Sequence, residues 1–340
     1  MTENIAVYGA TGHTGRHVTT ELRRRGHTPL LLGRDLAQLQ TLGEHPRQAN
    51  TDDPAALDRA LHDAAAVINT AGPFATTAGP LIEAAQRAGI PYLDVAAEIE
   101  ANLDTFTRYA DSPTPIIPAM AFFGGLGDLL ATTALDGATT ADEIQIAYGL
   151  TSWHPTPGTL AAGTVSAQRR GGRRLRYTAG SLRHHDDALP IVDWTFPAPL
   201  GPQKVLAEFT MADVVTIPTH LHVPTITTYM TTSAATDLAN AGPRTPETFT
   251  VDVRIRTGTT EHRITATGHD IYAVTAPLAV EAAERLLTGR THHTRGVASA
   301  ATAFDAPDFL TALTPHLTVH HHPERQTQDQ NTLSVRPDAP

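Results

Sequence analysis

The feature that most constrains this chain is a glycine-rich segment near its start, Gly9-Ala10-Thr11-Gly12-His13-Thr14-Gly15. A β-prone run at 4–8 precedes it, and 16–25 follows with apolar side chains at helical spacing. Glycines between a strand and a helix permit a tight turn and a close approach of the backbone to a pyrophosphate, which the helix N-terminus attracts. The segment predicts dinucleotide binding, with a merely structural turn as the alternative. The expected contacts are Gly9, Thr11, Gly12, His13, Thr14 and Gly15.

The pattern of a strand followed by a helix recurs after this segment. Short apolar runs at 29–32, 64–69, 91–95 and 115–118 alternate with helical stretches such as 79–88. Alternation of this kind is typical of βαβ units around a parallel sheet. We therefore predict an α/β fold with a Rossmann-type doubly wound parallel sheet in residues 1–135.

The sequence pattern changes at Glu143. Thr-rich and β-branched segments of alternating polarity follow, and they predict antiparallel strands. These segments are 143–150, 223–232, 249–257 and 261–267, whereas 169–202 gives no clear elements. The run 275–289 is strongly helical and ends in Gly289. We expect an inserted α+β substrate domain at 136–270, a C-terminal segment at 271–325 that returns to the first domain, and a frayed tail at 326–340.

Composition narrows the class of partner. With 41% hydrophobic and 18% charged residues the chain can build a sizeable core, and its net charge of −10 without a basic block disfavours nucleic acid and anionic lipid. The absence of cysteine excludes disulfides, thiolate metal sites and a Cys nucleophile. The N-terminus lacks signal-peptide features, and 116–135 is too interrupted to span a membrane. We expect a cytoplasmic protein with a small-molecule substrate, and a homodimer as a possible assembly.

The residue after the second strand bears on the choice of dinucleotide. Arg34 occupies the place where a guanidinium can pair with a 2′-phosphate, which predicts NADP. Asp35 is the competitor, because it could serve a ribose or merely cap the next helix. Asn50, past the third strand, is a candidate for the adenine edge.

The segment after the fourth strand should lie where the nicotinamide half of the cofactor arrives. Small residues there give the ligand access to the backbone, and Asn69 can bond the ribose or the loop itself. Pro73 could instead form a rigid turn. The expected contacts in this segment are Asn69, Ala71, Gly72, Pro73 and Phe74.

The proton donor is less constrained. Lys204 is the only lysine and Leu200 stands four residues before it, which excludes the Tyr and Lys pair of short-chain dehydrogenases. Asp94 and Glu98 follow the fifth strand, and either can act in the site or serve as a helix cap and structural acceptor.

Three further side chains are candidates from the second half of the chain. His154 follows Trp153 and could donate a proton, or could be a satisfied histidine in a buried turn. Tyr229 and Tyr148 lie on expected strands, where a place in the core competes with a place in a pocket.

Histidine is abundant, with 18 residues, but three clusters, His220 with His222, His184-His185-Asp186-Asp187 and His320-His321-His322, do not match HExxH or another ligand spacing with a stated mechanism. We expect no metal, and we expect His320-His321-His322 to be solvated. The basic run Arg169–Arg174 could pair with a phosphate or carboxylate of the substrate, or could be a solvated or oligomer-contact patch.

Four strings together resemble the saccharopine dehydrogenase-like NADP-binding oxidoreductases, a group that includes trans-acting enoyl reductases. The strings are GATGHTGR, NTAGPF, PYLDVAAE and GHDIYAVTAPLAVEAAERLL. The resemblance implies a Rossmann domain, a central insertion that carries substrate, and a C-terminal helix that returns to the first domain. It places Gly9, Thr11, Gly12, Thr14, Gly15, Arg34, Gly72, Pro73 and Phe74 on cofactor positions.

Two segments depart from that family. Ala97 stands where the family has a glycine before the glutamate, and Ala121-Phe122-Phe123-Gly124-Gly125 replaces a polar segment. The expected activity is NADPH-dependent reduction of a C=C, C=N or C=O bond of a secondary-metabolite-like substrate. A redox-neutral cyclase or epimerase and a non-catalytic NADP sensor are the alternatives.

Overall fold

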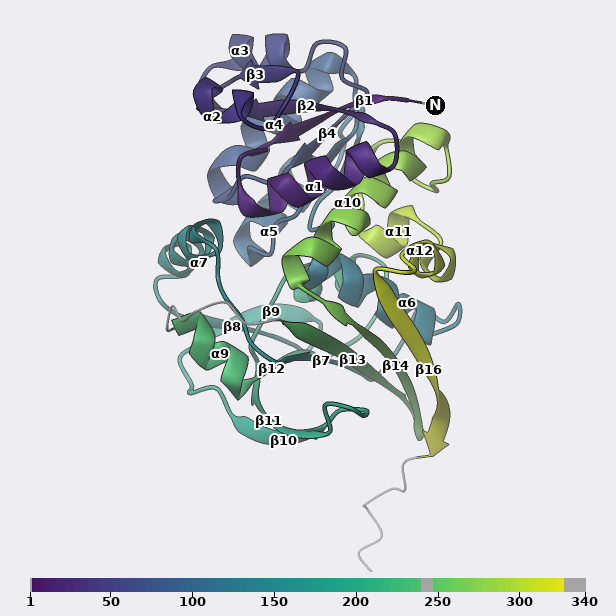
Figure 1. Ribbon diagram of the computed structural model, residues 1–340. Helices are drawn as coiled ribbons and strands as arrows, with labels where there is room; N and C mark the ends of the chain where they lie inside the picture. Colours follow the sequence, from purple (N-terminus) through teal and green to yellow (C-terminus); the bar gives the residue numbers. More distant parts are fainter. Residues whose placement is uncertain (1, 240–246, 327–340) are drawn as a thin grey trace, which may run out of the picture.

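The computed structural model describes residues 2–239 and 247–326, which form two sheets that lie one above the other in Figure 1. The first sheet is parallel, in the spatial order β15-β6-β5-β4-β1-β2-β3. Its order reverses between β1 and β4, the point at which ligands bind in open α/β sheets. The strands are β1 (Asn4–Tyr8), β2 (Thr28–Gly33), β3 (Pro46–Gln48), β4 (Ala66–Asn69), β5 (Tyr92–Asp94), β6 (Pro115–Ile117) and β15 (Gly296–Val297).

Helices cover both faces of this sheet. Ile5 and Val7 point to a core shared with Val18 of α1, whereas Ala6 points to a core shared with Leu81 of α4. The alternation buries both faces of β1, so the prediction of a doubly wound sheet is confirmed. The helices are α1 (His13–Arg24), α2 (Leu36–Gln40), α3 (Pro54–Ala60), α4 (Phe74–Ala88) and α5 (Ile99–Arg108).

The second sheet is mixed, in the order β10-β11-β12-β7-β13-β14-β16, with the hairpin β8–β9 joined through β12. Its strands are antiparallel except for the pair β12 and β7. The strands are β7 (Glu143–Leu150), β8 (Arg174–Thr178), β9 (Ser181–His185), β10 (Ile191–Thr195), β11 (Pro202–Ala207), β12 (Ile226–Thr231), β13 (Thr248–Thr257), β14 (Thr260–His269) and β16 (Leu317–Gln326).

Further helices connect or cover this sheet. They are α6 (Gly127–Ala134), which a distorted turn at Phe122–Leu126 precedes, α7 (Pro157–Arg169), α8 (Asp213–Thr216) with a short 3-10 turn at Ile217–Thr219, and α9 (Thr232–Ala239). No helix in the described ranges is long and apolar enough to cross a bilayer.

The C-terminal part of the chain is divided between the two sheets. Helix α10 (Ile271–Thr288) leaves the second sheet and runs beside α1 (Figure 1), where Arg25 binds Glu281 and Glu284 at 2.6 and 2.5 Å. Strand β15 then joins the first sheet, and α11 (Ala300–Ala303) and α12 (Ala306–Ala312) follow.

Strand β16 differs from what the sequence predicts. It pairs with β14, so 317–326 belongs to the second sheet although 271–325 was expected to complete the first domain. The frayed tail was expected to begin at residue 326, yet backbone pairing to β14 includes Gln326. Residues 327–340 of the expected tail lie outside the described residues. The unassigned region 169–202 forms β8, β9 and β10. Side chains of β9 and β10 are largely exposed and give no apolar alternation, whereas β8 is too short for its two buried residues, Leu175 and Tyr177, to stand out.

Candidate functional site

A cleft of about 1050 Å³ lies between the first sheet and the second-domain segments that cover it. Its floor is the glycine turn, from which Gly9, Thr11, Gly12, His13 and Thr14 line the cleft. Gly9 has a φ of 84°, and a Cβ on Gly15 would lie 2.2 Å from the carbonyl oxygen of Gly9. Because α1 begins at His13 directly above this contact, only a glycine at position 15 lets the helix start so close to the strand.

Arg34 stands where β2 ends, and its exposed side chain borders both the cleft and a smaller adjoining hollow. The neighbouring Asp35 caps α2, since its Oδ1 accepts the N–H of Gln38 at 3.1 Å. Gln48 holds the backbone here by donating to the carbonyl of Arg34 at 2.8 Å. Arg34 and Asp35 both border the smaller hollow, and one carboxylate oxygen of Asp35 is used by the helix cap. Asn50 is exposed and does not line the cleft.

The loop after β4 is shaped by Asn69, which is fully buried. Its Oδ1 accepts the N–H of Ala71 at 3.0 Å, and its Nδ2 donates to Thr77 and Tyr92 at 3.1 Å each. The amide thus positions the loop and does not itself line the cleft. The expected contacts Ala71, Gly72 and Phe74 do line it, whereas Pro73 stands at the N-cap of α4 outside the lining.

Asp94 lies below the cleft, at the end of β5, and does not line it. Its carboxylate accepts the hydroxyl of Tyr92 at 2.9 Å and the N–H groups of Ala96 and Ala119 at 3.0 and 2.8 Å. Complete burial raises the pKa of Asp94 to about 6. The arrangement joins the ends of β5 and β6, which is the structural role that competed with catalysis in the sequence.

Glu98 lines the cleft, but both of its carboxylate oxygens cap α4. Oε1 accepts the N–H of Phe74 at 2.7 Å, and Oε2 accepts that of Ala75 at 3.2 Å. Burial raises the pKa of Glu98 above its ordinary value, and these two backbone bonds oppose the rise. Its geometry fits a residue that holds the nicotinamide-side loop.

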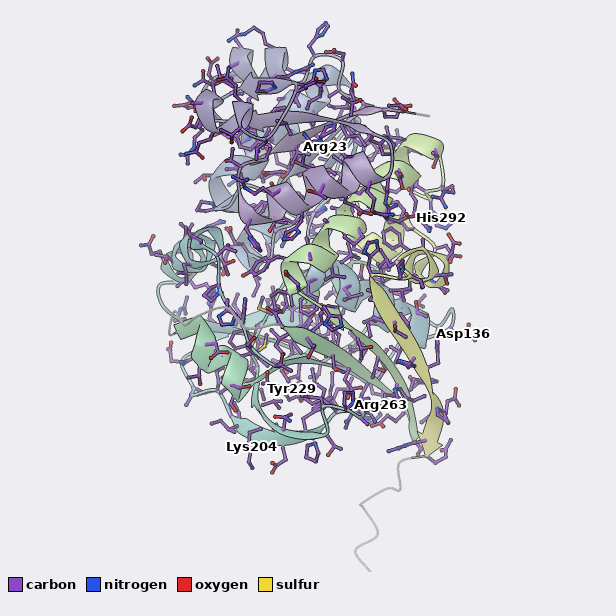
Figure 2. All side chains as sticks on the ribbon, in the orientation of Figure 1. Arg23, Asp136, Lys204, Tyr229, Arg263 and His292 are labelled. Carbon is purple, nitrogen blue, oxygen red and sulfur yellow. The ribbon has the colours of Figure 1, made fainter. Side chains whose placement is uncertain are left out.

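The remaining donor candidates lie outside the cleft lining. His154 is half-buried beside the wall formed by Trp153. Tyr229 packs on Trp194 with ring centroids 4.8 Å apart, and Figure 2 shows it in the second-sheet part of the molecule. Tyr148 is buried and donates to Asp213 at 2.8 Å, behind the turn that carries Phe123.

The wall opposite the glycine turn is aromatic, and the sequence motifs did not indicate it. Phe122, Phe123, Trp153 and Phe209 line this side of the cleft. They come from different parts of the chain, and the centroids of Phe123 and Trp153 are 5.5 Å apart. The segment Ala121–Gly125, which replaces a polar family segment, contributes Phe122 and Phe123 to this wall. Its two adjacent phenylalanines were the one available signal.

Tyr272 is the functional candidate that the sequence reading missed. It lies in the first turn of α10, lines the cleft, and sets its ring edge-on to His13 at 5.1 Å. Its hydroxyl accepts the indole N–H of Trp153 at 3.2 Å and lies 3.0 Å from the hydroxyl of Thr159. A phenol thus stands between the turn and the aromatic wall. Only its place after Asp270 at a helix start could have drawn attention to it.

Comparison with known proteins agrees with this architecture. Residues 9–114 match the family described as NAD(P)H-binding, while no curated protein sequence matches the chain. Apo histidine-tagged saccharopine dehydrogenase (L-Glu forming) from Saccharomyces cerevisiae is similar in structure, with a TM-score of 0.63 and 11% identity over 94% of this chain and 100% of that one. An engineered D-amino acid dehydrogenase bound to NADP+ gives a TM-score of 0.49 and 13% identity over 93% and 97%.

Proposed function

We propose that this chain is an NADPH-dependent reductase. It has an NAD(P)H-binding domain, and its overall fold is similar to that of saccharopine dehydrogenase. The observation that carries the proposal is one continuous cleft that runs from the glycine turn and Arg34 to an aromatic wall. A cofactor on the turn and a small substrate against the wall would share this space. The substrate class is a small, largely apolar molecule with a C=C, C=N or C=O bond.

The residues present fit the dinucleotide. The tight approach of Gly15 to Gly9 leaves N–H groups at the start of α1 for a diphosphate, and Arg34 can pair with a 2′-phosphate. Asp35 is occupied as a helix cap, which supports NADP over NAD. When bound, NADPH supplies a hydride, and the protein or water must supply the accompanying proton.

Tyr272 is the proposed proton donor. Tyr272 lines the cleft, and its hydroxyl lies beside Trp153 and Thr159, which line the same cleft where the substrate would lie. After it gives its proton to the substrate, the indole N–H of Trp153 and the N-terminus of α10 stabilise the remaining phenolate. Water then restores the proton, so that one hydride and one proton are delivered in each cycle.

The test is a screen of small enones, cyclic imines and ketones with NADPH, followed by absorbance at the nicotinamide band. Steady substrate-dependent consumption of NADPH is the expected result. Product formation without net consumption would indicate a redox-neutral enzyme, and nucleotide binding without turnover of any substrate would indicate a sensor. With an accepted substrate, Tyr272→Phe should lower kcat by about 100-fold while NADPH affinity stays within a fewfold.

A further inference from the structure

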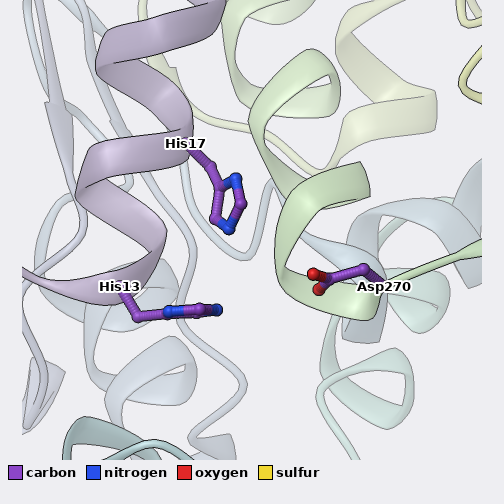
Figure 3. Close-up of side chains that lie close together, drawn as sticks. All are labelled: His13, His17 and Asp270. Atoms are coloured by element: carbon purple, nitrogen blue, oxygen red, sulfur yellow. The ribbon is translucent and has the colours of Figure 1, made fainter. Parts of the chain in front are cut away.

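Two histidines and an aspartate converge beside the glycine turn. His13 and His17 stand four residues apart on α1, and their ring centroids are 5.0 Å apart. Asp270 faces them from the junction of β14 and α10 (Figure 3), and the ligand atoms of the three side chains all lie within 4.8 Å of one another. All three residues are half-buried, so an ion could enter from solvent and still be partly enclosed.

The donor set has the chemistry of a transition-metal site. Two imidazoles at helical spacing with one carboxylate bind Zn²⁺ and similar ions and leave further positions open. Metal–ligand bonds of about 2.0–2.2 Å place ligand atoms about 3–3.5 Å apart in tetrahedral or octahedral geometry. Small rotations of the two rings would close the present spacing to that range. Because the sequence contains no cysteine, no thiolate competes for such an ion.

Asp270 is held in place independently of any ion. Its Oδ1 accepts the N–H groups of Tyr272 and Ala273 at 2.9 and 3.1 Å. Its φ of 52° and ψ of 101° lie in a region that residues with a side chain seldom occupy. Both backbone bonds use Oδ1, so the other carboxylate oxygen can serve a cation. A bonded carboxylate of this kind keeps its orientation when a metal binds.

The affinity of this site for a cation should depend on whether a dinucleotide occupies the neighbouring glycine turn. The N-termini of α1 and α10 both lie here, and their dipoles disfavour a cation. Asp270 offsets part of that effect. A diphosphate on the glycine turn would add negative charge beside His13, which lines the same cleft. The ion should therefore bind more tightly when the dinucleotide is bound, and the dinucleotide should bind more tightly when the ion is bound, since such coupling is reciprocal.

We propose that His13, His17 and Asp270 bind one first-row transition dication of the Zn²⁺ or Co²⁺ type. The ion ties the nucleotide-binding turn to the junction between the second sheet and α10. The proposal does not depend on reductase activity, and only the coupling to dinucleotide rests on nucleotide binding at the turn. Arg25, at the C-terminal end of α1, already joins α1 to α10 through ion pairs with Glu281 and Glu284.

The test uses chelator-treated full-length protein titrated with Co²⁺, followed by visible absorption, and with Zn²⁺ by calorimetry. His17→Ala should weaken binding at least tenfold, because it removes one of three ligands but does not line the cleft. His62→Ala is the matched control, since His62 is an exposed histidine of the same domain with a neighbouring carboxylate, Asp63. Saturating NADP+ should tighten binding in the wild type by severalfold.

Metal binding by other histidines and nucleotide binding by the variant must both be measured to interpret the titration. His320, His321 and His322 lie next to one another on β16 and could bind Co²⁺ weakly, so the loss caused by His17→Ala is diagnostic and the total stoichiometry is not. NADPH affinity of metal-free His17→Ala should equal that of metal-free wild type, which separates this proposal from the proposed function. Equal Co²⁺ affinity in wild type and His17→Ala, or no binding at 1 mM Zn²⁺ (about the weakest affinity of interest), overturns the site.

Discussion

The two ends of the cleft are built in different ways. At the glycine-turn end, the main chain makes the site: glycines bring β1 and α1 together within one short segment. At the substrate end, side chains make the site, and Phe123, Trp153 and Tyr272 come from three separate parts of the chain. The first end depends on local backbone geometry, and the second exists only after both sheets have assembled.

This difference has consequences for tolerance to mutation. A side chain added at the glycine-turn end occupies ligand space or strains a turn, so single substitutions there should abolish binding. The aromatic wall can repack around a changed side chain, so substitutions there should alter which substrate is accepted before they abolish turnover. Each prediction below tests one side of this contrast.

The largest effect is expected from Gly12→Val. A Cβ at Gly12 would lie 3.1 Å from the carbonyl oxygen of Gly9, and the rest of the valine side chain would enter the space offered to the diphosphate. Affinity for NADPH should fall at least 100-fold, measured by calorimetry, while circular dichroism and the melting temperature show a folded protein. Binding that survives within tenfold would contradict a main-chain site at this turn.

Asp94 tests whether the buried carboxyl at the end of β5 has a structural role. Burial raises its folded pKa from 3.8 to about 6, so between these values the folded state keeps a proton that the unfolded state has lost. The unfolding free energy of the wild type therefore falls as the pH rises through this window, by up to about 3 kcal/mol for a rise of two pKa units. The side chain introduced by Asp94→Asn has no ionisable group, but its amide oxygen can still accept hydrogen bonds.

In urea unfolding, the stability of Asp94→Asn relative to wild type should accordingly rise by about 2 kcal/mol from pH 4 to pH 7. Asp58→Asn is the control, because Asp58 is half-exposed and pairs with Arg87 on the surface. A difference between Asp94→Asn and wild type that does not change with pH would show that burial does not raise the pKa of Asp94 in the folded protein.

The same contrast explains what could be predicted from the sequence. The glycine turn, Arg34 and the loop at Ala71 and Gly72 were identifiable because strand, turn and helix are contiguous and the parallel sheet fixes which ends meet. Tyr272 was not, because its partners Trp153 and Thr159 lie more than a hundred residues away in the chain. No periodicity encodes that meeting.

Polar residues at the end of β5 show a second limit. Asp94 and Glu98 have the residue type and position of catalytic acids, and only their hydrogen bonds reveal that they accept backbone N–H groups. Strand β16 shows a third limit, since most of its side chains are exposed and polar and its place in the sheet follows from backbone pairing to β14 rather than from an apolar pattern.

A moderate effect is expected for Arg34→Ala. Loss of the guanidinium should lower NADPH affinity about tenfold, or about 1.4 kcal/mol, and leave NADH affinity nearly unchanged. Arg59→Ala, at an exposed position on α3, controls for the change in overall charge. Fluorescence titrations with both nucleotides measure the preference. If the variant keeps the wild-type ratio of affinities, the 2′-phosphate is recognised elsewhere or not at all.

The smallest effect is expected for His154→Ala. His154 was a candidate proton donor from the sequence, but it does not line the cleft, whereas Tyr272 does. Turnover of a substrate accepted in the screen should therefore stay within about threefold of wild type, with kcat and KM measured separately. A 100-fold fall in kcat at unchanged NADPH affinity would transfer the donor role from Tyr272 to His154. It would also imply that the segment after β7 moves into the cleft when substrate binds, so that the substrate end is assembled by the ligand as well as by the fold.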